Sequence, residues 1–299
     1  MNLADSAISK MRPPKNMHII CIDVTNKCDL ACSNCTRLLE NQDAFWEMTP
    51  ENFRLALQSL KDFHGIIAMI GGNPVMHRNF EELCAIFEEE IPNKFQRGLW
   101  TNSIFKHTDL ALRTFGTFNL NVHGNPKSER SMQELAKQAV DAGAVVWNYA
   151  GHSDHAPLLT AIQDLMSEEE MWQAIPQCDI NREWSASIVQ NQGELRSYFC
   201  EVAAAFDLAR NQDRGHAVKP GWWKEEMQAW SDQVKHFCPG CGVAAKQSPH
   251  KDFEEIDVYT ETNRDLAEKS TKDKKRKIIY LQPENSSMIN RRVTQYNTL

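Results

Sequence analysis

Short apolar runs alternate with longer amphipathic segments over the first 175 residues of the chain. The run MHIICIDV at 17–24 is apolar and β-branched, which is typical of a buried strand. Thr49 followed by Pro50 is a common helix start, because threonine caps the first turn and proline fits its first position. The strands expected are 17–24, 65–70, 96–101, 117–122 and 144–149, and the helices expected between and after them are 50–63, 78–90, 107–115, 128–142 and 156–174.

This alternation predicts repeated βα units, which make parallel strands through right-handed crossovers. Such a series curls into a full or partial barrel. A polar cluster follows each expected strand, and the clusters have the patterns CxxxCxxC, GGNP, TNS, NVHGN and NYAGH. Barrels and open α/β sheets carry their active sites at this carboxyl edge. We therefore predict an α/β fold, a partial (β/α)5-6 TIM-like barrel, with a site at the carboxyl ends of its strands.

The pattern changes after about residue 176. Strand-like runs at 184–189 and 194–199 flank Asn191-Gln192-Gly193, which predicts a hairpin. Helices are expected over 201–210 and 222–236, and a C-x2-C pair follows them. Together with the hairpin they predict a small second module held together by cysteines. The expected organisation is an N-terminal extension at 1–16, the barrel at 17–175, the module at 176–245 and a polar C-terminal extension at 246–299.

Composition narrows the class of protein. The chain has 299 residues, 41% of them hydrophobic and 24% charged, as in a soluble globular protein. It lacks the roughly 18 consecutive apolar residues of a membrane span and the apolar core of a signal peptide, so a cytoplasmic location is expected. A net charge of −7 argues against a wide nucleic-acid-binding surface. The basic segment 269–277 is either a solvated tail or a contact for a polyanion.

Nine cysteines in a chain of this kind indicate metal binding or redox chemistry more often than disulfides. Cys28, Cys32 and Cys35 form C-x3-C-x2-C directly after the first strand, and three such thiolates can hold three irons of a four-iron cube. The alternative is a zinc site with a remote fourth ligand. Cys21 and Cys84 lie within apolar patterns and are expected to be buried small hydrophobes.

With GGNP after the second strand, this motif resembles that of the radical S-adenosylmethionine (SAM) enzymes over residues 17–175. The resemblance implies a 4Fe-4S cluster on the three cysteines, with the open iron binding the amino and carboxylate groups of SAM. Asn34 stands where the family usually has an aromatic residue, and Asn73 stands where it usually has an acidic one. A polar loop residue that does not contact SAM would instead use its side chain to hydrogen-bond the backbone of the loop. The SAM-contacting positions implied by the resemblance are Gly71, Gly72, Asn73, Pro74, Asn102, Ser103, His123 and Asn148.

A second set of four cysteines flanks the expected hairpin and helices. Its layout resembles the twitch module, a shortened SPASM domain, and all four ligand positions of an auxiliary 4Fe-4S cluster are present. Structural zinc is the alternative, since a C-x2-C pair is also half of a zinc ribbon. The four ligands implied are Cys178, Cys200, Cys238 and Cys241.

Two further groups of residues invite interpretation. His152, Asp154 and His155 follow the fifth strand and are candidates for proton transfer at the barrel mouth, or else a solvated loop. The tryptophans at 222–230 are expected to pack the module onto the barrel rather than to form a stacking platform for bases.

The resemblance implies reductive cleavage of SAM by an electron from a flavodoxin- or ferredoxin-type donor. The resulting 5′-deoxyadenosyl radical would take hydrogen from a polar substrate, for oxidation or rearrangement, with the auxiliary cluster assisting. Three alternatives remain open. They are an isomerase or modifying enzyme for a hypermodified base in phage DNA, an enzyme that modifies a ribosomally made peptide, and a non-enzymatic iron–sulfur or zinc scaffold. The expected partner is thus a small polar, peptide or nucleic-acid substrate, without a membrane.

Overall fold

One eight-stranded sheet organises the chain, and its strand order is β5-β4-β3-β2-β1-β7-β8-β9. The computed structural model describes residues 2–104, 106–123, 126–150, 154–251, 253–270 and 277–281, without the side chains of 126–128 and 148–150. The six strands from β5 to β7 pair in parallel, and β8 and β9 pair antiparallel at one edge. The strands are β1 (Ile19–Thr25), β2 (Ile66–Gly71), β3 (Arg97–Thr101), β4 (Thr117–Asn121), β5 (Val145–Ala150), β7 (Ser185–Asn191), β8 (Glu194–Tyr198) and β9 (His216–Ala217).

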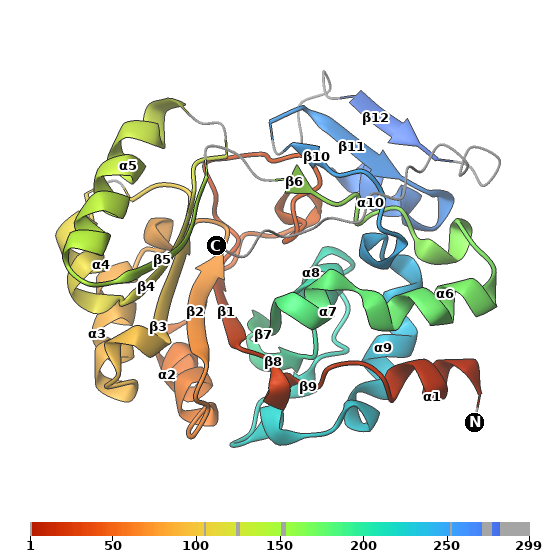
Figure 1. Cartoon of the computed structure of the whole chain (residues 1–299), viewed down its shortest axis with the longest axis horizontal. Helices are drawn as coiled ribbons and strands as arrows, with labels where there is room; N and C mark the ends of the chain where they lie inside the picture. Colours follow the sequence, from red (N-terminus) through yellow and green to blue (C-terminus); the bar gives the residue numbers. More distant parts are fainter. Residues whose placement is uncertain are drawn as a thin grey trace.

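Four helices follow the first four strands and cover the outer face of the sheet (Figure 1). Their apolar faces are buried there, with Phe53, Phe87 and Phe115 meeting in edge-on ring contacts. The predicted fold class, a partial TIM-like barrel of βα units, is confirmed. These helices are α2 (Pro50–Ser59), α3 (Phe80–Glu90), α4 (Thr108–Thr114) and α5 (Pro126–Asp141).

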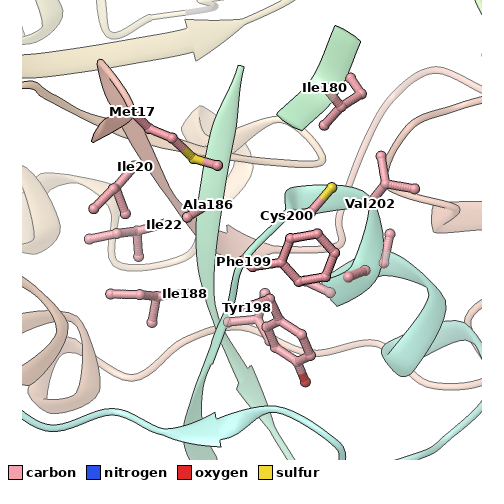
Figure 2. Close-up of a cluster of buried hydrophobic side chains, with 14 of the residues drawn as sticks. Met17, Ile20, Ile22, Ile180, Ala186, Ile188, Tyr198, Phe199, Cys200 and Val202 are labelled. Carbon is pink, nitrogen blue, oxygen red and sulfur yellow. The ribbon is translucent and has the colours of Figure 1, made fainter. Parts of the chain in front are cut away.

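β1 is buried along its whole length, and its alternate residues serve two different environments. Ile20 and Ile22 point into the main core, where they lie beside Ala186 and Ile188 of β7 (Figure 2). Ile19 and Cys21 point to the opposite side, into a small cluster with Trp100 in the barrel lumen. This period of two is what a central strand of a closed or curled sheet requires.

The hairpin of β7 and β8 forms where it was predicted, but β7 also pairs in parallel with β1. The sheet therefore runs without a break across the expected boundary between residues 175 and 176. Helix α8 (Glu201–Ala209) packs on the face of β7 opposite Ile188, where Ser185 donates to Glu201, and Phe199 and Val202 lie on that side (Figure 2). The domain limits themselves stay a prediction.

Two helix predictions are wrong. Residues 156–167 are not α-helical, because α6 (Glu168–Ala174) begins only at Ser167, whose side chain and Glu170 form a capping box. The expected helix 222–236 is two short 3-10 turns followed by α9 (Ser231–Phe237).

The tryptophans of that broken segment still pack as predicted. Trp222 and Trp230 are buried at an edge-on ring contact, and Trp222 Nε1 donates to Ser59 Oγ on α2 at 3.2 Å. Trp223 meets Phe63 edge-on. The segment therefore fastens the C-terminal half of the chain to the barrel, as expected.

The C-terminal extension is folded where it is described, although it is sparsely apolar. β10 (His250–Lys251) pairs with β6 (Asp154–His155), and β11 (Ile256–Tyr259) pairs in parallel with β12 (Lys277–Tyr280) beside α10 (Arg264–Lys269), at the upper right of Figure 1. Within the described ranges, no helix is long and apolar enough to cross a membrane.

Asn34 fastens this extension to the cysteine loop. Its backbone N–H donates to Asp257 Oδ1 at 2.7 Å, and its side chain donates to the Ile256 carbonyl at 3.2 Å and accepts from Val258 N–H at 3.4 Å. Asn34 also has a φ of 48°, a left-handed conformation that asparagine tolerates better than most residues. The residue at the position where the resemblance implies an aromatic is thus a docking point for β11.

Replacing Asn34 by glycine keeps the left-handed backbone but removes the two side-chain hydrogen bonds to β11. We expect the extension to loosen by about 1–2 kcal/mol, since each buried hydrogen bond contributes about 1 kcal/mol. Limited proteolysis should then cleave 246–281 faster than in the wild type. Gln192→Gly, at the exposed tip of the β7–β8 hairpin with a φ of 49°, is the matched control. Equal cleavage rates in the two variants would contradict this role for Asn34.

Candidate active site

A cavity of about 490 Å³ opens at the carboxyl ends of the parallel strands. Its volume lies in the range of small-molecule sites. One part of its wall is the loop after β1, which contributes all three thiols of the C-x3-C-x2-C motif. The facing part comes from the C-terminal half of the chain and includes Asp179, Glu201, Val243, Lys246 and Gln247.

The turn after β2 touches the cysteine loop through its backbone. Gly72 N–H donates to the Thr25 carbonyl at 2.7 Å, and Asn73 N–H donates to the Lys27 carbonyl at 2.7 Å. A Cβ on Gly72 would lie 2.2 Å from the Lys27 oxygen, and Gly71 has a φ of +134°. Both glycines are therefore required for the turn to lie against the loop, and both line the cavity.

Asn73 is fully buried and holds two turns together. Its Nδ2 donates to Ser103 Oγ at 2.6 Å, and its Oδ1 accepts from Thr101 Oγ1 at 2.8 Å. An amide fits this position because it donates and accepts at once, which a carboxylate does not. Asn73, Pro74 and Ser103 lie behind the cavity wall rather than in it.

The other predicted SAM-contacting residues fall in different places. Asn102 lines the cavity and donates from Nδ2 to Cys28 Sγ at 3.7 Å. His123 also lines it, with a φ of 48° and its ring 5.7 Å from that of His155. Asn148 lies on β5 in register with Asn119, and its side chain is outside the described part of the structure.

Two of the three predicted proton-transfer residues line the cavity. Asp154 and His155 line the cavity, where Asp154 accepts from Lys251 Nζ at 3.1 Å and His155 Nδ1 lies 2.8 Å from the Ser33 carbonyl. His152 lies outside the described residues. The cysteine loop and β6 are therefore neighbours at the barrel mouth.

Arg37, two residues after the motif, is the residue that sequence reasoning missed most clearly. Its guanidinium is buried and donates to Asp23 Oδ1 at 2.7 Å and to both oxygens of Glu201, at 2.9 and 3.1 Å. Ser187 donates to Asp23 at 2.6 Å, and Ser185 donates to Glu201 at 2.5 Å. This network joins the cysteine loop, β1, β7 and α8.

The network shifts the pKa values of its two carboxyl groups in opposite directions. Burial raises the pKa of Asp23 in spite of the neighbouring guanidinium. Burial also opposes ionisation of Glu201, but the charge of Arg37 and its hydrogen bonds outweigh it and hold the pKa of Glu201 below its usual value. Cys21, expected to be a simple buried hydrophobe, lies in the same network with its Sγ 3.1 Å from Ser185 Oγ. Cys84 does lie in the main core as expected.

The first three cysteines meet a simple test as cluster ligands. They share one cavity wall, and a backbone N–H at Leu30 stabilises the Cys28 thiolate, while burial raises the pKa of that thiol to about 12. Backbone donors to a sulfur are part of the usual setting of cluster thiolates.

The second four cysteines also come together, from three separate segments. Cys178 precedes α7 (Asp179–Glu183), Cys200 is the N-cap of α8, and Cys238 and Cys241 bracket a 3-10 turn. Burial raises the pKa of each thiol, and the four are close enough for their charges to interact. Backbone N–H groups of Ile180, Ala203 and Val243 stabilise three of the thiolates.

Within the described residues, no three His, Cys, Asp or Glu side chains converge closely enough to hold a single metal ion. In a cluster each thiolate binds its own iron, so its ligands lie further apart than those of one ion. The donor sets present are soft thiols, which suit iron–sulfur clusters or zinc.

Among solved structures, this chain is similar to a crystal structure of BtrN in complex with AdoMet and 2-DOIA. The two share 17% sequence identity at a TM-score of 0.51, over 75% of this chain and 92% of BtrN. The chain has a BtrN-like fold. Two further structures align with lower TM-scores. They are Streptococcus suis SuiB bound to precursor peptide SuiA (15% identity, 76% of this chain, 70% of SuiB, TM-score 0.37) and methylornithine synthase PylB (16%, 48% of each chain, TM-score 0.33). No protein-family model and no curated protein matches the sequence.

His77 follows the 3-10 turn Pro74–Met76 that comes after the Gly-Gly turn. Its Nε2 donates to the Met48 carbonyl at 2.9 Å and its Nδ1 accepts from Asn79 N–H at 3.0 Å, an arrangement that needs a neutral ring. Burial lowers the pKa of His77 below the usual 6.5, aided by Arg78 and opposed by Met48 and Glu47.

We expect this histidine to make the fold acid-sensitive. Because the folded pKa is depressed, the unfolded chain binds more protons below 6.5, so stability is present at neutral pH and is lost as the pH falls. Denaturant unfolding between about pH 7.5 and pH 5.5 should show a smaller decrease in His77→Gln than in the wild type. A decrease of equal size in both proteins would contradict the assignment.

Proposed function

We propose that this chain is a radical SAM enzyme with a 4Fe-4S cluster on Cys28, Cys32 and Cys35. One observation carries the proposal: the three thiols and the Gly71-Gly72 backbone line a single cavity at the carboxyl ends of parallel strands. The BtrN-like fold supports it, since that crystal structure contains AdoMet. Three thiolates leave one iron of a cube without a protein ligand, and that iron is where SAM would bind.

The residues of this chain would hold and shield the reacting groups. Gly71 and Gly72 offer only backbone to the cavity, so a ligand can approach the main chain directly. Ile70, Trp100 and Trp184 supply apolar wall, which keeps water from a reactive species. When bound, the cluster and SAM supply one-electron cleavage of SAM to methionine and a 5′-deoxyadenosyl radical that takes hydrogen from the substrate.

We propose a second 4Fe-4S cluster on Cys178, Cys200, Cys238 and Cys241. Its support is position as well as thiol chemistry. Asp179 and Glu201, which directly follow two of these cysteines, line the same cavity as the first three thiols. If these four cysteines hold a cluster, it would lie near a substrate in that cavity and could accept an electron from it or orient it. Structural zinc is the alternative that metal analysis distinguishes.

The reaction needs a one-electron donor of flavodoxin or ferredoxin type, and we propose a polar substrate that is oxidised or rearranged. A cavity of about 490 Å³ favours a small molecule or a single reactive group over a long polymer. No contact within the described ranges supports action on a hypermodified DNA base or on a ribosomally made peptide. Residues 271–276 of the basic segment lie outside those ranges. A scaffold without activity is the outcome if SAM is not cleaved.

Replacing Cys28, Cys32 and Cys35 together by alanine should remove about half of about eight irons per chain after anaerobic reconstitution. SAM cleavage by the reduced protein should be abolished, because the ligand-binding iron is lost. Iron content and 5′-deoxyadenosine formation are the measurements. Cys84→Ala, a core thiol outside both sets, should keep full iron and full cleavage. Stoichiometric zinc without iron–sulfur absorbance in the wild type would overturn the proposal.

Cys238→Ala tests the second cluster separately. We expect it to leave substrate-free SAM cleavage partly intact, because Cys238 belongs to the other set of thiols. The variant should also lose iron and unfold at lower denaturant concentration, because metal binding and local folding are coupled. Full iron content and unchanged stability would show that these four cysteines hold no cluster.

A further inference from the structure

Asp179 and Lys246 form an ion pair in the wall of the cavity. Lys246 Nζ donates to Asp179 Oδ1 at 3.1 Å. Both residues line the cavity, and their side chains remain 28% and 35% exposed, so a molecule in the cavity can reach both charged groups. Neither residue belongs to the cysteine loop or to the Gly-Gly turn, so the proposed SAM site makes no use of them.

The backbone of Lys246 adopts a conformation that lysine rarely takes. Its φ is 50° and its ψ is 45°, which is left-handed, at the end of the 3-10 turn Val243–Ala245. This conformation is unfavourable for any residue with a Cβ, and glycine or asparagine would fit it better. The next residue, Gln247, is buried and donates from Nε2 to Thr160 Oγ1, which fixes the turn. Backbone strain of this kind gathers at functional positions.

Apolar side chains flank the ion pair in the same wall. Asp179 is the first residue of α7, which packs against the turn Val243–Ala245 that precedes Lys246. Ile180, Trp184 and Val243 line the cavity beside the two charged groups. A few polar groups set in apolar wall are the usual way in which a small-molecule site fixes the orientation of its ligand.

We propose that Asp179 and Lys246 form the subsite that binds neighbouring hydroxyl groups of an uncharged polyol substrate. This inference rests on the proposed function only in taking the cavity as the substrate site. The ammonium of Lys246 has three N–H donors, of which Asp179 uses one, and a carboxylate accepts through both of its oxygens. One hydroxyl can therefore accept from Lys246 and donate to Asp179 at once. A hydroxyl on the next carbon can use the remaining donor or acceptor.

The charge of the wall disfavours other classes of ligand at this place. A carboxylate or phosphate would face Asp179 and the carboxylate of Glu201, which lines the same cavity. An ammonium group would face Lys246. Like charges repel strongly where water is partly excluded. A hydroxyl avoids both conflicts and leaves the ion pair intact.

Saturation-transfer difference NMR on the full-length, reconstituted chain with SAM present tests the subsite, because the method detects weak ligands. The probes are myo-inositol and D-glucose as neutral polyols, sodium gluconate as an anionic polyol and L-alanine as a zwitterion. We expect saturation transfer to at least one neutral polyol. Titration should show that gluconate and alanine bind at least fivefold more weakly than that polyol.

Lys246→Met keeps the aliphatic part of the side chain and removes its donors. It should weaken binding of the responsive polyol roughly tenfold, the usual effect of losing a hydrogen bond to a charged group. Lys251→Met is the matched control, because it removes an ion pair of the same 3.1 Å length with Asp154, and Lys251 is not among the described residues that line the cavity. Polyol binding should be unchanged in this control. If Lys246→Met folds poorly by circular dichroism, Asp179→Asn must weaken binding instead.

Three results overturn the subsite: no saturation transfer to either neutral polyol, equally strong binding of gluconate or alanine, and equal weakening in Lys246→Met and Lys251→Met. SAM cleavage by the same wild-type protein after reduction separates this inference from the proposed function. Intact cleavage without polyol binding removes only the subsite. Polyol binding that depends on Lys246, without cleavage, removes only the enzyme activity.

Discussion

The buried guanidinium of Arg37 is the contact on which the arrangement of both cysteine sets depends. It lies two residues after Cys35 and binds Glu201, the residue directly after Cys200. Through Asp23 it also holds the end of β1. Removing one partner of such a group leaves an uncompensated buried charge, at a cost of about 3–5 kcal/mol, whereas apolar replacement of the whole group is often neutral. Its value is therefore positional: the two cysteine segments cannot move apart without exposing or orphaning a charge.

The same contact explains why the C-terminal half does not behave as a separate attachment. Arg37 reaches α8 only because β7 pairs with β1 and brings Ser185, Ser187 and Glu201 to the lumen. The sheet, the ion network and the cavity all cross the point where the composition changes. Asn34 adds a second connection on the outer side, through β11. Both connections start from the cysteine loop, so the position of that loop depends on residues 164 to 223 positions away in sequence.

The barrel could be predicted from the sequence because the signals for its strands, helices and turns are local. Apolar runs, the Thr49-Pro50 helix start and the Gly-Gly turn each depend on neighbouring residues, and all form as expected. The helix predicted for residues 156–167 does not form, because its apolar pattern has no capping residue. Residues of this segment hydrogen-bond instead to distant partners such as Gln247 and Thr260. Arg37 and Asn119, which line the cavity, were missed for a related reason. A charge after a motif and a polar residue within a strand look like solvent-facing positions until the fold shows which side of the sheet they occupy.

Residue roles suggested by family resemblance are carried over to this chain unevenly, and the physical reason is clear. At Gly71 and Gly72 the backbone itself demands the residue type, because any side chain would collide with the cysteine loop. At Asn34 and Asn73 the resemblance implies an aromatic and an acidic side chain, yet both amides are buried and bonded to the protein. Neither lines the cavity. Positions fixed by backbone geometry can keep their residue type across a distant resemblance, whereas positions defined by a side-chain contact are free to become structural.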